Sequence, residues 1–316
     1  MNEPELSVVV PLFNEAENLE ELCRRLKQVM DNCPLPTEAV LVNDGSTDGS
    51  GPYLTSIALE DERFQLIELS RNFGHQIAIS AGLEHARGRR AVFIIDGDLQ
   101  DPPELLPQFL ELMNEGYDVV YGIRKSRKEG FFKKIAYKQF YRMLSRITPV
   151  DLPLDSGDFS LISRRVADVI NSMPEESRYL RGMRAWAGFR QTGLPYTREK
   201  RHAGSSKYSI SALTKLAYNG IFNFSEFPVK LITYSGFFAF SISVIYSIHV
   251  LYMRFFYGNV PQGFTALLFS IVMFGGIQLM SVGILGEYIT RIYFQTRNRP
   301  LYIVRNKILD RKSRTP

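Results

Sequence analysis

Two long stretches without charged residues constrain this chain more than any other feature of its sequence. Residues 231–253 and 263–286 contain no Asp, Glu, Lys or Arg. At about 1.5 Å per residue, either stretch forms a helix of roughly 35 Å, enough to cross a hydrocarbon core of about 30 Å. A pair of buried core helices is the alternative, but uncharged segments of this length favour membrane spans. We therefore predict two transmembrane helices, at about 231–254 and 263–287, within a membrane region of residues 230–291.

The charges that flank these stretches predict their orientation. The connection 254–262 carries one basic residue, whereas the chain after Glu287 carries eight basic residues and one acidic residue, Asp310. The positive-inside tendency then puts both termini and the N-terminal domain in the cytoplasm, with residues 292–316 as a basic cytoplasmic tail. The acidic start, MNEPELSVVV, is not typical of a secretory signal peptide. A net charge of +5 fits an anionic membrane surface better than nucleic acid, because basic residues gather around the membrane segments.

Short segments rich in Val and Ile recur before residue 230, with helical patterns between them. They predict five strands: 6–13, 38–44, 64–70, 90–96 and 117–123. Strands that alternate with helices are typical of an α/β domain with a mainly parallel, Rossmann-like sheet between two helical layers. We expect this domain to span residues 1–208 and an amphipathic juxtamembrane segment to follow at 209–229.

One segment inside this domain has the pattern of a helix at a membrane surface. The stretch FFKKIAYKQFYRMLSRI, residues 131–147, places apolar residues at helical spacing and interleaves Lys and Arg among them. An interfacial amphipathic helix is the preferred interpretation, and a solvated helix packed on the domain is the alternative.

Polar residues gather where three of the predicted strands end. The first strand runs into PLFNE (11–15), the second into NDGSTD (43–48) and the fourth into DGD (96–98). Each cluster alone also suits a turn and a helix cap, but three at corresponding strand ends indicate a binding site. The sequence contains no GxxxxGK[ST] loop and no GxGxxG after the first strand. A P-loop NTPase and a dinucleotide oxidoreductase are therefore not supported.

Oxygen ligands are concentrated at the end of the fourth predicted strand, at Asp96, Asp98 and Gln100. Hard oxygen ligands in small number suit Mg²⁺ or Mn²⁺, which keep coordination positions open for substrate phosphates. Such a metal ion would bridge a diphosphate and neutralise the charge that develops on a leaving nucleoside diphosphate. We predict a divalent-metal site at these three residues.

Seven motifs follow one another between about Ser7 and Val304: VVVPLFNEAENL, LVNDGSTDGS, DGDLQDPPE, SGDFSLISRR, RGMRAWAGF, RHAGSSKYS and GEYITRIYFQTRNRPLYIV. In this order they resemble the polyprenyl-phosphate glycosyltransferases of glycosyltransferase family 2, and most closely the bacterial bactoprenol glucosyltransferases, which are related to dolichol-phosphate mannose synthase. The resemblance implies a GT-A fold, a nucleotide-sugar donor, a divalent metal ion and a lipid-phosphate acceptor in the membrane.

The resemblance also implies roles for individual residues. Four would bind the nucleoside, with Asp44 facing the base: Pro11, Phe13, Glu15 and Asp44. Asp96 would belong to both the donor site and the metal site, and three basic residues would bind phosphates: Arg124, Arg201 and Lys207. The catalytic group would comprise Asp158, which matches an acidic active-site residue of the bacterial branch, with Asp98 and Arg201. The middle residue of the DxD motif is Gly97, a tolerated variation.

The acceptor chemistry makes Asp158 a positioning group in our hypothesis. Most acceptors are hydroxyl groups that need a general base. A phosphate monoester does not, because its second pKa is about 6 and it is mostly dianionic at neutral pH. We therefore expect Asp158 to orient a substrate or an arginine rather than to accept a proton.

Together these features predict an inverting, metal-dependent transfer of a hexose to undecaprenyl phosphate, with UDP-glucose as the leading donor, by a multi-pass protein of the bacterial inner membrane. GDP-mannose or an amino-sugar donor is the alternative within the same chemistry. A lipid translocator or adaptor is an alternative of another class, but the two stretches offer His249 and no strongly charged residue for a transport route. The sugar, the nucleotide base, the choice between Mg²⁺ and Mn²⁺ and any homo-oligomer stay open.

Overall fold

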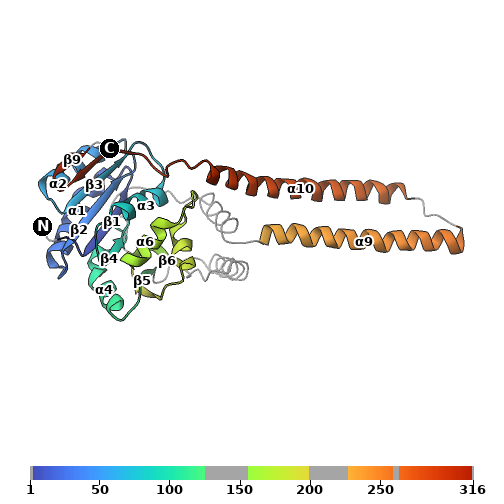
Figure 1. Ribbon diagram of the computed structural model, residues 1–316, viewed down its shortest axis with the longest axis horizontal. Helices are drawn as coiled ribbons and strands as arrows, with labels where there is room; N and C mark the ends of the chain where they lie inside the picture. Colours follow the sequence, from blue (N-terminus) through green and yellow to red (C-terminus); the bar gives the residue numbers. More distant parts are fainter. Residues whose placement is uncertain (1–2, 125–155, 199–226, 259–262, 315–316) are drawn as a thin grey trace. The chain divides into compact units, whose positions relative to one another are not determined.

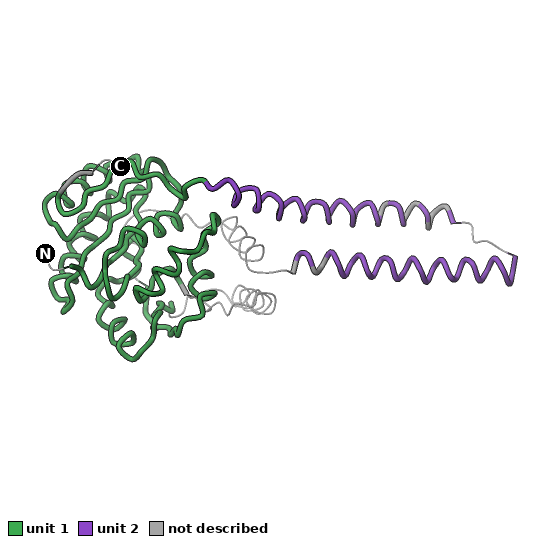
Figure 2. Tube along the Cα trace, in the orientation of Figure 1, with its two compact units in different colours: residues 1–142, 150–209, 299–316 green, residues 143–149, 210–298 purple. Residues whose placement is uncertain are grey.

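The computed structural model describes residues 3–124, 156–198, 227–258 and 263–314. The chain forms two compact units (Figure 2): Met1–Arg142, Val150–Ser209 and Arg299–Pro316 make up the first, and Met143–Pro149 and Ile210–Asn298 the second. The predicted interfacial helix 131–147, residues 209–226 of the predicted juxtamembrane segment, and both Arg201 and Lys207 lie outside the described residues.

The first unit is built on a sheet whose nine described strands have the order β7-β5-β6-β4-β1-β2-β3-β8-β9. Figure 1 labels β1 to β6 and β9 of this sheet. The strands are β1 Leu6–Leu12, β2 Thr37–Asn43, β3 Phe64–Leu69, β4 Ala91–Ile94, β5 Val119–Arg124, β6 Ser156–Ser163, β7 Gln191–Tyr196, β8 Val304–Leu309 and β9 Lys312–Arg314. The five predicted strands are present as β1 to β5. The sheet is mixed rather than mainly parallel, because β6 pairs antiparallel with β4 and β5, and β8 pairs antiparallel with β3 and β9.

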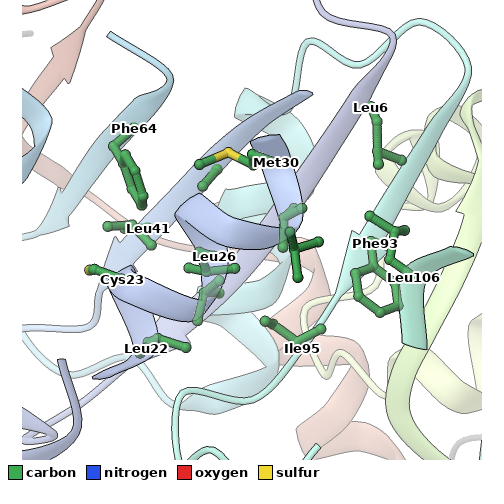
Figure 3. Packing of buried hydrophobic residues seen from close by; sticks show 14 of the residues in the cluster. Leu6, Leu22, Cys23, Leu26, Met30, Leu41, Phe64, Phe93, Ile95 and Leu106 are labelled. Atoms are coloured by element: carbon green, nitrogen blue, oxygen red, sulfur yellow. The ribbon is translucent and has the colours of Figure 1, made fainter. Parts of the chain in front are cut away.

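Helices cover the sheet and enclose two apolar cores. They are α1 Leu19–Asn32, α2 Ser50–Glu60, α3 His75–His85, α4 Leu106–Asn114, α6 Arg164–Ser172 and α7 Leu180–Trp186. Alternate residues of β1 enter different cores: Val8 and Val10 join one, whereas Val9 joins the other. The first core includes Leu22 and Leu26 of α1 together with Leu41 of β2 (Figure 3). Burial on both faces explains the near-continuous apolar runs of these strands.

The segment predicted as a basic tail, 292–316, contains two strands of this sheet. Ile308 of β8 lies opposite Leu66 of β3, and Arg87 Nη1 lies 3.0 Å from Asp310 Oδ1. The hydroxyl of Tyr302 donates a hydrogen bond to Glu84, at 2.6 Å. The strand gives a weak sequence signal because Ile308 is its one buried residue, while basic residues occupy partly or fully exposed positions.

The second unit contains two long helices that contact each other, α9 Phe227–Tyr257 and α10 Phe264–Thr296. Within the described part of the chain, one segment is long and apolar enough to cross a membrane, Ile232–Tyr257, with a mean hydropathy of 1.6. This matches the first predicted span by length and composition. The second predicted span, 263–287, coincides with α10 from Phe264 onward and stays a prediction.

The pairing of β8 with β3 should contribute measurably to stability. Ile308 is 1% exposed, so Ile308→Ala removes buried methyl groups and should lower the free energy of unfolding by about 2 kcal/mol or more. Ile303, just before β8, is 54% exposed, and Ile303→Ala serves as the matched control. Thermal unfolding of the full chain in detergent would measure both. Equal, small shifts in the two variants would contradict a stabilising role for β8.

Candidate active site

The strand order brings the predicted site residues to one edge of the sheet. Since β2, β1 and β4 are parallel and β6 runs the other way, the carboxyl ends of the first three lie beside the amino end of β6. Read across this edge, Asp44 follows β2, residues 13–15 follow β1, Asp96 follows β4 and Asp158 lies in the first half of β6. Arg124 ends β5, the next strand along.

The register between β4 and β6 brings two carboxylates together. It pairs Ala91 with Ser163 and Ile94 with Ser160, so continuing it by two residues sets Asp96 opposite Asp158. His75, the first residue of α3, lies between them: its Nε2 is 3.4 Å from Asp96 Oδ1 and 3.5 Å from Asp158 Oδ2. Burial lowers the pKa of His75, but the hydrogen bond to Asp158 and the charges of both carboxylates raise it to about 9. The imidazole is therefore a cation at neutral pH.

Asp158 is held from three sides. Arg181 of α7 donates from Nε to Oδ1 at 2.9 Å and from Nη2 to Oδ2 at 3.3 Å. Gln76 donates to Oδ2 at 2.9 Å and accepts from the backbone of Leu180 at 2.9 Å, which joins α3 to the start of α7. Burial raises the pKa of Asp158, but the charge of Arg181 and the bonds from His75 and Arg181 hold it well below its usual range. Such a carboxylate stays ionised and is a weak proton acceptor.

The predicted metal ligands lie in the turn after β4. Asp98 Oδ1 accepts a hydrogen bond from the backbone N–H of Gln100 at 3.1 Å. Burial is the main cause that raises the pKa of Asp96 to about 6, and the neighbouring carboxylates add to it against the charge of His75. Asp96 Oδ1 and Asp101 Oδ2 are buried without a hydrogen-bond donor. Concentrated carboxylates with such oxygens fit a hard divalent cation.

Arg198, two residues after β7, already faces this acidic turn. Its Nη2 lies 3.9 Å from Asp96 Oδ2 and 3.8 Å from Asp98 Oδ2, and its Nε lies 3.3 Å from Asp101 Oδ1. Within the described ranges, no group of three or more His, Cys, Asp or Glu side chains has the arrangement of a metal site.

The middle position of the DxD motif has a steric explanation. A Cβ atom on Gly97 would lie 2.4 Å from Leu12 Cδ2 and 3.3 Å from the carbonyl oxygen of Pro11. A larger residue fits here only if the buried side chain of Leu12 moves, while β1 and the turn keep this distance. Leu99, two residues on, has a φ of 59°, a left-handed conformation that costs on the order of 1–3 kcal/mol and is typical of functional turns.

The residues predicted to bind the nucleoside form the other end of the edge. Asp44 accepts backbone hydrogen bonds from Phe73 at 2.7 Å and Gly74 at 2.9 Å, so it fixes the loop that leads into His75. Burial raises the pKa of Asp44, against these two bonds. Glu15 accepts from Asn18 at 2.6 Å. Pro11 lies within β1 opposite Val42, and Phe13 directly follows the strand.

Arg124, at the end of β5, lies over Gly157, the residue before Asp158. A Cβ atom on Gly157 would come within 3.2 Å of Arg124 Nη2, so the guanidinium packs over that glycine. Arg124 is hydrogen-bonded to Tyr196, whose hydroxyl donates to Asp101 at 2.5 Å. Tyr196 therefore links Arg124, which is predicted to bind a phosphate, to Asp101 in the acidic turn.

Sequence reasoning missed several residues that the fold brings to this site: His75, Gln76, Asp101, Arg181, Arg184, Tyr196 and Arg198. Asp101 and the α7 arginines lie in motifs that carry the family resemblance, DGDLQDPPE and RGMRAWAGF, so their motifs were a usable signal. Of the predicted site residues, the structure describes all except Arg201 and Lys207.

An α/β domain with this edge of acidic and basic residues defines the class as a GT-A-like glycosyltransferase, and comparison with known proteins agrees. Residues 7–170 match the family model Glycosyl transferase family 2. The chain therefore belongs to glycosyltransferase family 2, as its motifs predict.

Relatives match over nearly the full chain. The uncharacterized glycosyltransferase YkcC of Bacillus subtilis is 44% identical over 299 residues, 94% of this chain and 92% of its own. A bactoprenol glucosyl transferase of Shigella phage SfV is 37% identical over 303 residues, 96% of this chain and 98% of its own. Among solved structures, the mannosyltransferase PcManGT from Pyrobaculum calidifontis, in complex with GDP-Man and Mn²⁺, has 17% identity and a TM-score of 0.47, covering 89% of this chain and 88% of its own.

The steric limit at Gly97 gives a test of the turn geometry. Gly97→Ala should lower glycosyl transfer by about tenfold or more, because the clash with Leu12 displaces the carboxylates on either side. Adding Leu12→Ala removes the clashing Cδ2 and should restore most of the transfer, while the cavity lowers the unfolding temperature. Transfer rates and unfolding temperatures of the three variants would decide. Full activity in the Gly97→Ala protein alone would contradict the steric argument.

Proposed function

We propose that this enzyme transfers a hexose, with glucose from UDP-glucose as the leading donor, to undecaprenyl phosphate at the cytoplasmic face of the bacterial inner membrane. The observation that carries this proposal is the pairing of the acidic turn at Asp96 and Asp98 with Asp158 across β4 and β6. The family membership and the activity for which the phage relative is named support it. GDP-mannose or an amino-sugar nucleotide is the alternative donor.

The proposed donor site follows the order of groups along the sheet edge. Pro11, Phe13, Glu15 and Asp44 would bind the nucleoside at the ends of β1 and β2. Mg²⁺ or Mn²⁺ held by Asp96, Asp98 and Gln100 would, when bound, neutralise charge on the leaving diphosphate. Arg124 would contact a donor phosphate from the β5 side, and Arg201 and Lys207, outside the described residues, would complete the cationic surround.

Asp158 would act as a fixed negative charge that positions a substrate group or an arginine. It is anchored by Arg181 and Gln76 and stays ionised, so it can fix a substrate hydroxyl or hold Arg181 toward a phosphate. A single displacement would then proceed with the acceptor oxygen attacking the anomeric carbon opposite the departing nucleoside diphosphate. The dianionic acceptor supplies its own nucleophile and needs no proton acceptor.

We also propose the membrane arrangement that the sequence predicts. A catalytic domain of residues 1–208 would be followed by a juxtamembrane segment, 209–229, and two spans within 230–291, with both termini cytoplasmic. The helix at 131–147 would lie in the interface, and residues 292–316 would be cytoplasmic and, through β8, part of the catalytic sheet. The apolar segment Ile232–Tyr257 supports the first span.

A donor screen would test the function. Purified full chain with undecaprenyl phosphate and Mg²⁺ or Mn²⁺ is offered UDP-glucose, UDP-galactose, UDP-N-acetylglucosamine or GDP-mannose, and mass spectrometry detects the lipid-linked sugar. We expect product from UDP-glucose above the others. Product from another donor alone would correct the sugar, and nucleotide release without any lipid product would overturn the acceptor.

The same assay tests the acidic turn. Asp98→Asn keeps the shape but removes a charged ligand, and should lower transfer by roughly 10² or more with the fold intact. The matched control is Asp168→Asn, which changes an exposed carboxylate paired with Arg164 on α6. Equal rates in the two variants, or full activity of Asp98→Asn under EDTA, would refute the metal assignment.

The pH dependence separates the two roles of Asp158. Its pKa is held well below 3.8, so it is ionised throughout the assay range and cannot cause a fall in rate near pH 6. We expect kcat/KM for the acceptor to fall below pH of about 6, where the acceptor phosphate gains its second proton. Asp158→Asn should slow transfer and keep this acidic limb. A limb present in the wild type and missing in Asp158→Asn would identify Asp158 as the base instead.

A further inference from the structure

Arg184 of α7 is a buried cation to which the proposed mechanism gives no role. The residue is 5% exposed, and its Nε and Nη2 atoms are buried without a hydrogen-bond partner among the described residues. Its guanidinium carbon lies 5.4 Å from the ring centroid of Tyr121. Burial lowers the pKa of Arg184 to about 10, which leaves it charged at neutral pH. A buried charge without hydrogen bonds is costly, so its retention suggests an anionic ligand.

The neighbouring charges leave Arg184 without a counterion of its own. Arg181, one helical turn earlier, is paired with Asp158, and the charge of Asp101 acts on Arg124. Asp158 also acts on Arg184, but no carboxylate of the described residues lies within ion-pair distance of it. The side chain of Arg181 is 24% exposed. The pair therefore combines one accessible and one buried guanidinium, and Asp158, which already has Arg181 and His75 as partners, is the carboxylate whose charge acts on Arg184.

The position of α7 indicates which phosphate this pair would bind. The donor's nucleoside would lie at β2 and β1 and its diphosphate at β4, whereas α7 packs against β6 and α6. In an inverting displacement the acceptor approaches opposite the leaving diphosphate, and Asp158 with α7 lies on the far side of Asp96 from Asp44. Trp186, at the end of α7, is 64% exposed, which suits an amphipathic ligand with a phosphate head and an apolar chain.

We propose that Arg184 and Arg181 bind the phosphate monoester of the lipid acceptor, with Asp158 orienting Arg181 toward it. This inference rests on the proposed function and adds the residues that would recognise the acceptor. Arg184 would supply charge from within the fold, and Arg181 would supply direct hydrogen bonds. A purely structural role is the competing explanation, because the ring of Tyr121 also stabilises a cation above it. A phosphate subsite predicts that loss of Arg184 weakens the binding of the acceptor and leaves the binding of the donor nucleotide unchanged. A purely structural role predicts no such difference between the two affinities.

Binding measurements on the full chain in detergent distinguish them. The probes are citronellyl phosphate, a short isoprenoid phosphate, and UDP, with citronellol and inorganic phosphate as separate arms. Arg184→Met should weaken citronellyl phosphate by about tenfold or more and leave UDP within about twofold. The matched control is Arg190→Met, because Arg190 is exposed and lies over a tyrosine ring, that of Tyr117, at 4.4 Å. This variant should change neither affinity.

The arms with citronellol and inorganic phosphate identify which part of the acceptor the arginines bind. Loss of affinity for both citronellyl phosphate and inorganic phosphate, with citronellol binding unchanged, would support a phosphate subsite. Unchanged citronellyl phosphate binding in Arg184→Met, or equal losses for citronellyl phosphate and UDP, would overturn it. If Arg184→Met does not fold, Arg184→Lys and Arg181→Gln are compared by the loss of affinity for citronellyl phosphate relative to that for UDP. Arg184→Lys should retain part of the affinity for citronellyl phosphate. Arg181→Gln should weaken citronellyl phosphate and leave UDP unchanged.

This outcome is separable from that of the proposed function. If the wild type does not glycosylate undecaprenyl phosphate from any donor, the proposed function is overturned. The affinities for citronellyl phosphate and UDP would still show whether the two arginines bind a phosphate. The opposite outcome is also possible: the wild type transfers glucose, and neither Arg184→Met nor Arg181→Gln changes the KM for the acceptor. That result would support the proposed function and contradict the phosphate subsite.

Discussion

The site depends on one electrostatic constraint, the approach of carboxylates from neighbouring strands. The antiparallel entry of β6 beside β4 sets Asp158 opposite Asp96, and Asp98 and Asp101 follow within a few residues. Like charges gathered in a poorly solvated place raise each other's cost of ionisation. Three cations from different parts of the fold offset this cost: His75, Arg181 and Arg198. A substrate metal complex would enter an arrangement that is already balanced, so binding would exchange partners rather than create charge from nothing.

The two carboxylates that face each other differ in their surroundings. Asp158 receives hydrogen bonds from Arg181 and Gln76, and its pKa is low. Asp96 has an oxygen without a donor, and its pKa is raised. The first is an anion fixed by hydrogen bonds, whereas the second has cations nearby, His75 and Arg198, and an oxygen that no donor holds. Unequal environments of this kind assign different work to chemically identical groups.

The sequence alone predicts what is local and misses what depends on pairing. β1 to β5 are evident because both faces are buried, and Asp96 and Asp98 stand out because they end such a strand. His75 and Asp158 are 83 positions apart, so their contact follows only from the placement of α3 beside β6. Arg184 looks like an ordinary helical arginine until its burial is known. β8 escapes detection because an edge-side strand with one buried residue carries almost no apolar pattern.

The return of the chain to β3 has a consequence for biogenesis. β8 is translated after both long helices, yet it pairs with a strand more than two hundred residues earlier. During synthesis the sheet therefore waits with the outer edge of β3 exposed, a row of unpaired amide and carbonyl groups of the kind that recruits other chains. Closing a contact of such sequence separation is slow. Any delay before residues 304–309 reach β3 would therefore prolong the exposure of this edge to other chains.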